Sequence, residues 1–267
     1  MINVSPDGTQ YALSGPQDAP VVILIHGLGL NKECWQWMIP KLKSTYRVLS
    51  YDLYGHGGSA APPSKPNLSL FRKQLVELLD LCSIEKGVII GFSLGGMIAR
   101  RFAQDTPHRT QALIILHSPH RRTEAAQAAI ISRVEQASKL GPQSTVEDAL
   151  ERWFTEKFRA NNPKLMDTVR GWVTANKKEV YHTIYDVLAT GIDEIIAPDP
   201  ALTCPTLVIT GEEDYGNGPE MAQAISNEIL GAKTIILPGL RHMALAEQPE
   251  AVNKPVQIFM EELEPLR

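Results

Sequence analysis

The stretch Gly87-Val88-Ile89-Ile90-Gly91-Phe92-Ser93-Leu94-Gly95-Gly96 decides the fold of this chain. An apolar run comes first, the pattern G-x-S-x-G follows, and a helix-forming run continues through residues 97–103. A strand, this pattern and a helix in that order form the turn that exposes a nucleophilic serine. Such a turn strains the serine backbone, and its two arms nearly touch, so only very small residues fit two positions before and after it. The sequence therefore predicts the Ser93 hydroxyl above a sheet edge, with the Leu94 amide directed at the oxygen of the attacked group.

Composition places the chain among ordinary globular enzymes. Its 267 residues, 43% hydrophobic and 21% charged, are enough for one large core with an insertion. The net charge of −4 and the scattered basic residues leave no electrostatic footprint for nucleic acid. We interpret the local pair Arg121-Arg122 as the solvated start of a helix.

Three features that the sequence lacks indicate where the protein is located in the cell. The first seven residues have neither the basic region nor the apolar run of a signal peptide. No apolar run approaches the length of a membrane span, so we expect no membrane partner. The cysteines, Cys34, Cys82 and Cys204, are odd in number and widely spaced, which argues against a disulfide framework. We therefore expect a cytoplasmic protein, whose oligomeric state the sequence leaves open.

Apolar runs alternate with helical patterns along most of the chain. Nearly all-apolar runs are typical of strands in a parallel sheet that is buried on both faces. The strand-like runs are at residues 21–25, 48–51, 88–90, 112–116, 206–210 and 234–237, and the helical patterns at 68–82, 94–104, 220–229 and 252–263. This alternation predicts an α/β fold with a mostly parallel, doubly wound sheet, preceded by a short antiparallel hairpin near residues 9–13.

The alternation breaks once, between residues 121 and 197, where only helical patterns occur. A block of helices inserted after the strand at 112–116 would enter from the carboxyl edge of the sheet, where open α/β sheets bind ligands. We therefore predict a helical cap, or lid, at 121–197 and a core formed by 1–120 and 198–267.

A serine hydroxyl needs a base to take its proton and an acid to orient that base. His242 lies between the last strand run and the last helix, so it should reach the edge that carries Ser93. Asp214 follows the strand at 206–210 and is the preferred acid, although Glu212 and Glu213 adjoin it. The resulting chain order Ser–Asp–His is one of the known triad orders. We interpret Asp52, the competing acid, as a carboxylate that fixes its own loop.

The loop His26-Gly27-Leu28-Gly29 follows the strand at 21–25. Glycine lets this loop approach the nucleophile, so the amides of Leu28 and Leu94 are predicted to form an oxyanion hole. We interpret His26 as a residue that holds the loop. No ligand spacing supports a metal at His26, His56 and His242, so we expect neither a metal nor an organic cofactor.

These motifs give the chain a resemblance to the α/β-hydrolase family over nearly its whole length. They are the loop beginning His26-Gly27, the run from Asp52 to Ser59, Gly91 to Gly96, Gly211 to Asp214, and His242. The chain is most similar to small bacterial esterases and enol-lactone hydrolases such as 3-oxoadipate enol-lactonase. Like them, it has a Glu-Gln-Pro stretch after the histidine, at residues 247–249.

The resemblance implies a serine hydrolase that cleaves a small, mostly apolar carboxylic ester or (enol-)lactone through an acyl-enzyme. Carbon–carbon hydrolases of ring-cleavage diketones usually carry tryptophan after the catalytic histidine, where this chain has Met243. Haloalkane dehalogenases and epoxide hydrolases carry aspartate in place of Ser93. Two alternatives stay open: a carbon–carbon hydrolase or cofactor-free perhydrolase on the same triad, and a ligand receptor with negligible turnover.

We expect aromatic and apolar side chains of the cap, and the residue after His242, to shape the substrate pocket. The predicted pocket residues are Trp153, Phe154, Trp172, Tyr185 and Met243.

Overall fold

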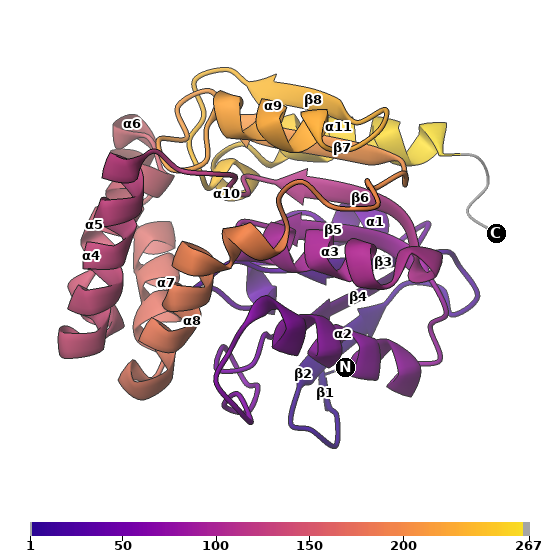
Figure 1. Cartoon of the computed structure of the whole chain (residues 1–267), viewed down its shortest axis with the longest axis horizontal. Coiled ribbons are helices and arrows are strands. Elements are labelled where there is room, and N and C mark those ends of the chain that lie inside the picture. Colours follow the sequence, from indigo (N-terminus) through magenta and orange to yellow (C-terminus); the bar gives the residue numbers. More distant parts are fainter. Residues whose placement is uncertain (1, 264–267) are drawn as a thin grey trace.

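The computed structural model describes residues 2–263, which fold around one eight-stranded sheet (Figure 1). The strand order is β1-β2-β4-β3-β5-β6-β7-β8. Strands β2 and β1 run antiparallel to their neighbours, and the remaining strands are parallel. The strands are β1 (Ile2–Val4), β2 (Gln10–Ser14), β3 (Val21–Ile25), β4 (Arg47–Tyr51), β5 (Gly87–Phe92), β6 (Thr110–Leu116), β7 (Thr206–Gly211) and β8 (Lys233–Leu237). The predicted fold class, with its N-terminal hairpin, is confirmed.

Helices cover the sheet, and its central strands form the core. All six residues of β5 are buried, as their apolar character predicts. Helix α3 packs on β3, β5 and β6, directly after the predicted nucleophile. The core helices are α1 (Ile39–Leu42), α2 (Leu68–Leu81), α3 (Leu94–Asp105), α9 (Pro219–Asn227), α10 (Ala244–Glu247) and α11 (Pro249–Glu262). Of these, the short α1 and α10 have no counterpart in the sequence analysis, because a single turn carries too little periodicity.

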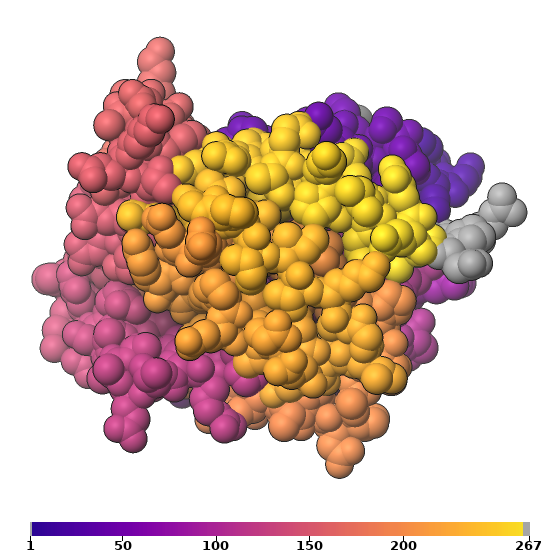
Figure 2. Space-filling model, turned by 90° about the horizontal axis from the view of Figure 1, so that it is seen from above, coloured from indigo at the N-terminus to yellow at the C-terminus, as the bar shows by residue number. Residues whose placement is uncertain are grey.

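The segment 121–197 contains only helices, and they gather at one end of the sheet (Figure 1). In Figure 2 they form the left-hand part of the molecule, beside the C-terminal segment drawn in yellow. They are α4 (Glu124–Leu140), α5 (Val146–Trp153), α6 (Glu156–Asn161), α7 (Pro163–Thr174) and α8 (Lys178–Thr190). Helices α4 and α8 pack against each other, although they lie far apart in the chain. That this group works as a lid stays a prediction.

The parallel strands bring their carboxyl ends to the same sheet edge. The loops after β3, β5, β6, β7 and β8 therefore meet there, and each carries residues that reach one cavity. Within residues 2–263, no helix is long and apolar enough to cross a membrane. The three cysteines are free thiols.

Candidate active site

The turn at Ser93 has the strained geometry that its sequence predicts. Ser93 has φ 55° and ψ −115°, a conformation that non-glycine residues rarely adopt. A Cβ atom on Gly91 would lie 2.3 Å from the carbonyl oxygen of Gly95, and one on Gly95 would lie 2.0 Å from that of Ile25. Glycine is therefore required on both arms. The turn is further held by Ser118, whose hydroxyl donates to the Ser93 carbonyl at 2.9 Å.

Asp214 and His242 form a buried acid–histidine pair. His242 Nδ1 donates to Asp214 Oδ2 at 2.7 Å, and Asp214 Oδ1 accepts the amides of Gly216 and Asn217 at 3.2 and 3.0 Å. Burial alone would raise the pKa of the Asp214 carboxyl. The adjacent His242 and the hydrogen bonds outweigh burial and hold that pKa well below its usual range. Asp214 is thus a fixed negative charge, which can orient the His242 ring.

Ser93 and His242 lie on the wall of the same cavity, which also borders Asp214. The rings of Phe92 and Trp153 flank the His242 ring, with centroids 4.9 and 6.0 Å away. The three residues predicted as nucleophile, base and acid are therefore brought together from three separate loops.

His117 is a site residue that the sequence analysis missed. It follows β6, is fully buried, and its Nδ1 donates to Asp214 Oδ2 at 3.0 Å, the oxygen that also accepts from His242. Burial lowers the pKa of His117, and Asp214 offsets this only in part, so the ring is neutral near pH 7. Its Nε2 has no hydrogen-bond partner within the described chain. Only its position at a carboxyl strand end could have signalled this role, and no motif marks it.

The loop after β3 runs beside the nucleophile. A Cβ atom on Gly27 would lie 3.0 Å from the Phe92 ring and 3.1 Å from the Ser93 Cβ, so this approach favours glycine. Within residues 2–263, no acceptor pairs with the amide of Leu28 or of Leu94. An oxyanion hole requires amides without an acceptor, and that these two form one stays a prediction.

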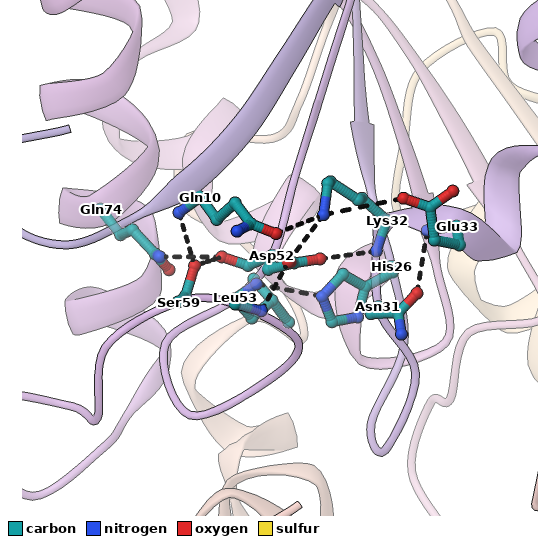
Figure 3. A network of polar contacts seen from close by, with 10 residues as sticks. Gln10, His26, Asn31, Lys32, Glu33, Asp52, Leu53, Ser59 and Gln74 are labelled. Carbon is teal, nitrogen blue, oxygen red and sulfur yellow. Dashed lines mark hydrogen bonds and ion pairs between the residues drawn. The ribbon is translucent and has the colours of Figure 1, made fainter. Parts of the chain in front are cut away.

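Two neutral histidines, His26 and His56, hold the loop after β3 in place by hydrogen bonds. His26 Nδ1 donates to the Gly27 carbonyl at 2.8 Å. Its Nε2 accepts the Leu53 amide at 3.0 Å, as Figure 3 shows. His56 Nε2 accepts the Gly29 amide at 2.9 Å. Burial lowers the pKa of His26, and burial together with the nearby His26 lowers the pKa of His56 to about 3. Both rings therefore have occupied nitrogens and structural partners.

Asp52 belongs to the same support and lies outside the cavity lining. Its Oδ1 accepts the Lys32 amide at 2.7 Å, and its Oδ2 accepts from Lys32 Nζ and the Gly58 amide at 3.1 and 2.9 Å (Figure 3). The carboxylate is fully buried and joins the loops after β3 and β4. Its contacts agree with the interpretation of Asp52 as a loop-fixing residue.

Among residues 2–263, one group of side chains lies close enough together to share a metal ion. Its members are His117, Asp214 and His242, whose ligand atoms lie within 4.8 Å of one another. The two hydrogen bonds to Asp214 Oδ2 account for this spacing. Nothing else in their geometry points to a metal.

The predicted pocket residues divide into two groups. Trp153 and Tyr185 line the cavity. Phe154, Trp172 and Met243 are not among its lining residues. Phe154 is fully buried and stacks on another cap phenylalanine, and Met243 is buried under the loop, with its amide bonded to the Trp153 carbonyl. The sequence shows that these side chains are apolar and on which helix each one lies. The packing of each helix decides which of them line the cavity.

Three arginines line the cap side of the cavity, which the sequence analysis did not foresee. They are Arg122, Arg133 and Arg152. The interpretation of Arg121-Arg122 as a solvated helix start is wrong for Arg122. Its guanidinium turns inward and donates to the carbonyls of Ala189 and Leu188 at the end of α8, at 3.3 and 3.1 Å.

Comparisons with known proteins agree with this architecture. A model of the alpha/beta hydrolase family matches residues 22–254. The chain is 29% identical over 266 residues to the (E)-2-((N-methylformamido)methylene)succinate hydrolase of Acinetobacter baylyi, covering 97% of both chains. It is 26% identical over 250 residues to 3-oxoadipate enol-lactonase 2 of the same organism, covering 94% of this chain and 92% of that one. The solved enol-lactonase of Burkholderia xenovorans LB400 has a TM-score of 0.88 and 25% identity, covering 96% of this chain and 98% of that chain.

Proposed function

Because this chain belongs to the alpha/beta hydrolase family, we propose that it is a serine hydrolase that cleaves a small-molecule carboxylic ester or enol-lactone. The observation that carries the proposal is the Asp214–His242 pair beside Ser93, which has the strained turn of an exposed nucleophile. The relatives named as enol-lactonases support the ester and lactone class. A relative named as a substituted-succinate hydrolase widens that class beyond lactones.

In the proposed mechanism, Ser93 Oγ attacks the carbonyl carbon and gives its proton to His242 Nε2. The carbonyl oxygen becomes an oxyanion that accepts hydrogen bonds from the amides of Leu28 and Leu94. When this tetrahedral intermediate collapses, the bond between the carbonyl carbon and the leaving oxygen breaks. The leaving oxygen takes the proton from His242 and departs as the alcohol or enol. Asp214 stays ionised and orients the His242 ring throughout.

In the second half of the proposed reaction, hydrolysis of the acyl-enzyme returns the enzyme to its starting state. Water attacks the acyl carbonyl and gives one proton to His242, and the oxyanion forms against the same two amides. Ser93 leaves with the proton from His242, and the product is a carboxylic acid. The helices α4–α8 would cover this chemistry as a lid and limit the access of water.

The test compares wild type, Ser93→Ala and Ser64→Ala with short p-nitrophenyl esters. We expect Ser93→Ala to lose about 10⁴- to 10⁶-fold in kcat, since its nucleophile is gone. The exposed Ser64 lies outside the cavity, so its variant should match the wild type. A fluorophosphonate probe should label the wild type at Ser93.

Two outcomes would contradict the proposal. Near wild-type turnover by Ser93→Ala would exclude this nucleophile. A wild type that neither turns over esters nor takes the fluorophosphonate label would favour a ligand receptor on this fold.

A further inference from the structure

The cap side of the cavity carries a concentration of positive charge. Arg122 comes from the loop after β6, Arg133 from α4 and Arg152 from α5, and all three line the cavity that contains Ser93. The only carboxylate among its lining residues is Asp214. That carboxylate already accepts from His117 and His242 and faces the core. No acidic side chain of the cavity is available to neutralise the arginines.

The hydrogen bonds of these arginines leave many donors unused. Arg122 donates to two backbone carbonyls, and Arg133 Nε donates to the Tyr185 hydroxyl at 3.1 Å. Arg152 has neither a hydrogen bond nor an ion pair with any residue of the described chain. A guanidinium carries five N–H donors, so the terminal nitrogens of Arg133 and all the nitrogens of Arg152 are without a hydrogen-bond partner in residues 2–263, and both side chains line the cavity.

Several arginines outside the cavity have carboxylate partners. Arg170, on cap helix α7, pairs with Glu147 and Asp167, each at 2.5 Å. Arg100, almost fully buried beneath the cap, pairs with Glu228 at 3.0 Å. The absence of carboxylates at the cavity is therefore a property of this site rather than of the chain.

The three like charges also act on one another. Burial, and next the charge of Arg133, lower the pKa of Arg122 to about 10 and lower the pKa of Arg152. Both side chains remain protonated at neutral pH. The cavity wall thus holds repelling, partly desolvated cations, an arrangement that an anion would stabilise.

We propose that Arg122, Arg133 and Arg152 form a carboxylate-binding site, and that the substrate carries a carboxylate in addition to the carbonyl that is cleaved. The proposal rests on the function proposed above and names its substrate class. A planar carboxylate matches the fork of a guanidinium, and two arginines from different helices can hold it from two sides. The cap would fix the charged end while Ser93 faces the scissile carbonyl at the core end. This proposal differs from the sequence-based expectation of a mostly apolar substrate, and the tests below distinguish the two.

The test uses two esters that differ in one free carboxylate: 4-nitrophenyl hydrogen succinate and its methyl ester. Nitrophenol release gives kcat/KM for wild type, Arg152→Gln, Arg133→Gln and Arg170→Gln. We expect the wild type to prefer the charged ester by about 100-fold, and that preference to fall at least 10-fold in Arg152→Gln and Arg133→Gln. Arg170→Gln should keep the wild-type preference, because Arg170 lies outside the cavity and already has acidic partners.

A binding measurement, which needs no turnover, tests the carboxylate site independently of the proposed hydrolase function. Succinate and glutarate are titrated calorimetrically into the Ser93→Ala protein and into Ser93→Ala/Arg152→Gln. We expect binding to the first and at least 10-fold weaker binding to the second, whether or not any ester is turned over. A wild type that prefers the neutral ester, or equal dicarboxylate binding with and without Arg152, would overturn the carboxylate site. Tighter binding of inorganic phosphate than of either dicarboxylate would overturn the assignment to carboxylates.

Thermal melting checks that the variants are folded. Arg152 has no hydrogen bond or ion pair to lose. Its burial and the repulsion from Arg133 outweigh the attraction of Asp148, one turn earlier in α5, so Arg152→Gln should melt at or above the wild-type temperature in the absence of ligand. A large fall in melting temperature would show that Arg152 supports the fold and would contradict a binding role.

Discussion

Two histidines donate to a single oxygen of Asp214, and this arrangement sets the electrostatics of the site. His242 is the partner that the triad needs, whereas His117 only touches the acid. A buried carboxylate is stable as an anion when several donors satisfy it, and here two ring nitrogens and two backbone amides do so. We therefore expect His117 to be a positioning residue that acts on the proposed reaction through Asp214.

The role of His117 can be separated from a purely structural one. His117→Ala should lower kcat about 10-fold with little change in KM, because the acid loses a charge-assisted hydrogen bond. His117→Asn should recover most of kcat, since asparagine keeps a donor and tolerates the positive φ of 49° at this position. Steady-state kinetics measures both. Equal losses in the two variants, or a loss confined to KM, would contradict the positioning role.

Glycine at position 95 is required by space alone. Gly95→Ala would place a Cβ atom 2.0 Å from the Ile25 carbonyl oxygen, and no side-chain rotation can relieve a clash with backbone. We expect a loss of about 2 kcal/mol or more in the free energy of unfolding, measured with urea.

Gly171 offers the matched control, because a Cβ atom there meets nothing within 4 Å and the residue lies inside helix α7. Gly171→Ala should raise stability by about 0.5–1 kcal/mol. If both alanine variants were equally stable, the close approach at Gly95 would not be the reason for its glycine.

At the scale of elements, the loop after β3 depends on histidines that must stay neutral. Protonation of His56 Nε2 would break its bond to the Gly29 amide, and protonation of His26 Nε2 would break its bond to the Leu53 amide. Asp52 and Lys32 are the charged groups beside these rings, and their opposite effects on His26 do not overcome burial. The loop that presents the Leu28 amide is therefore expected to weaken in acid.

The sign of the pH effect follows from the lowered pKa values. His56 has a pKa of about 3 when folded and about 6.5 when unfolded, so below pH 6.5 the unfolded chain binds the extra proton. This contribution to stability is complete above pH 6.5 and is lost as pH falls toward 3. As the pH falls below about 6.5, each such histidine should lower the free energy of unfolding by about 1.4 kcal/mol per pH unit.

Urea unfolding between pH 7.5 and 4.5 measures this slope. His56→Gln should be less stable at pH 7 but lose stability less steeply in acid, since glutamine can accept from Gly29 without titrating. The exposed His108 gives the control, and His108→Gln should keep the wild-type slope. An unchanged slope in His56→Gln would exclude His56 as a source of the acid sensitivity.

At the scale of the whole molecule, one carboxylate ties both connections of the cap to the core. Glu228, just after α9, accepts from Arg100 of α3 at 3.0 Å, from His120 at the cap entry at 2.9 Å and from the Ala197 amide at the cap exit at 2.9 Å. Arg100 also donates to the Ile195 carbonyl at 3.0 Å. The two stems of residues 121–197 thus share one anchor.

Removing that anchor should destabilise the protein and loosen the stems together. Glu228→Leu leaves the buried charge of Arg100 without a carboxylate partner, so we expect a loss of about 3 kcal/mol in the free energy of unfolding. Amide hydrogen exchange near residues 120 and 197 should rise in the same variant. The double variant Glu228→Leu/Arg100→Leu should lose less than the sum of the single losses. Strict additivity would mean that the ion pair contributes nothing to the anchor.

Most of the fold could be predicted from the chain, because its signals are local. Apolar runs such as 88–90 and 206–210 lie within the observed strands β5 and β7, and residues 121–197 form helices only. Parallel strands must place their carboxyl ends at one edge, so strand order alone brings Ser93, Asp214 and His242 toward one another. Their catalytic roles stay a prediction.

What the sequence by itself determined is therefore the architecture, the strained turn at Ser93 and the residues gathered at the sheet edge. Only the tertiary structure decided that His117 shares the oxygen of Asp214 and that Phe154 and Met243 are buried away from the cavity. It alone brought the three cavity arginines together. The reason is physical: periodicity fixes which face of a helix is apolar, whereas the angles at which α4, α5 and α8 pack decide which polar side chains converge on one cavity.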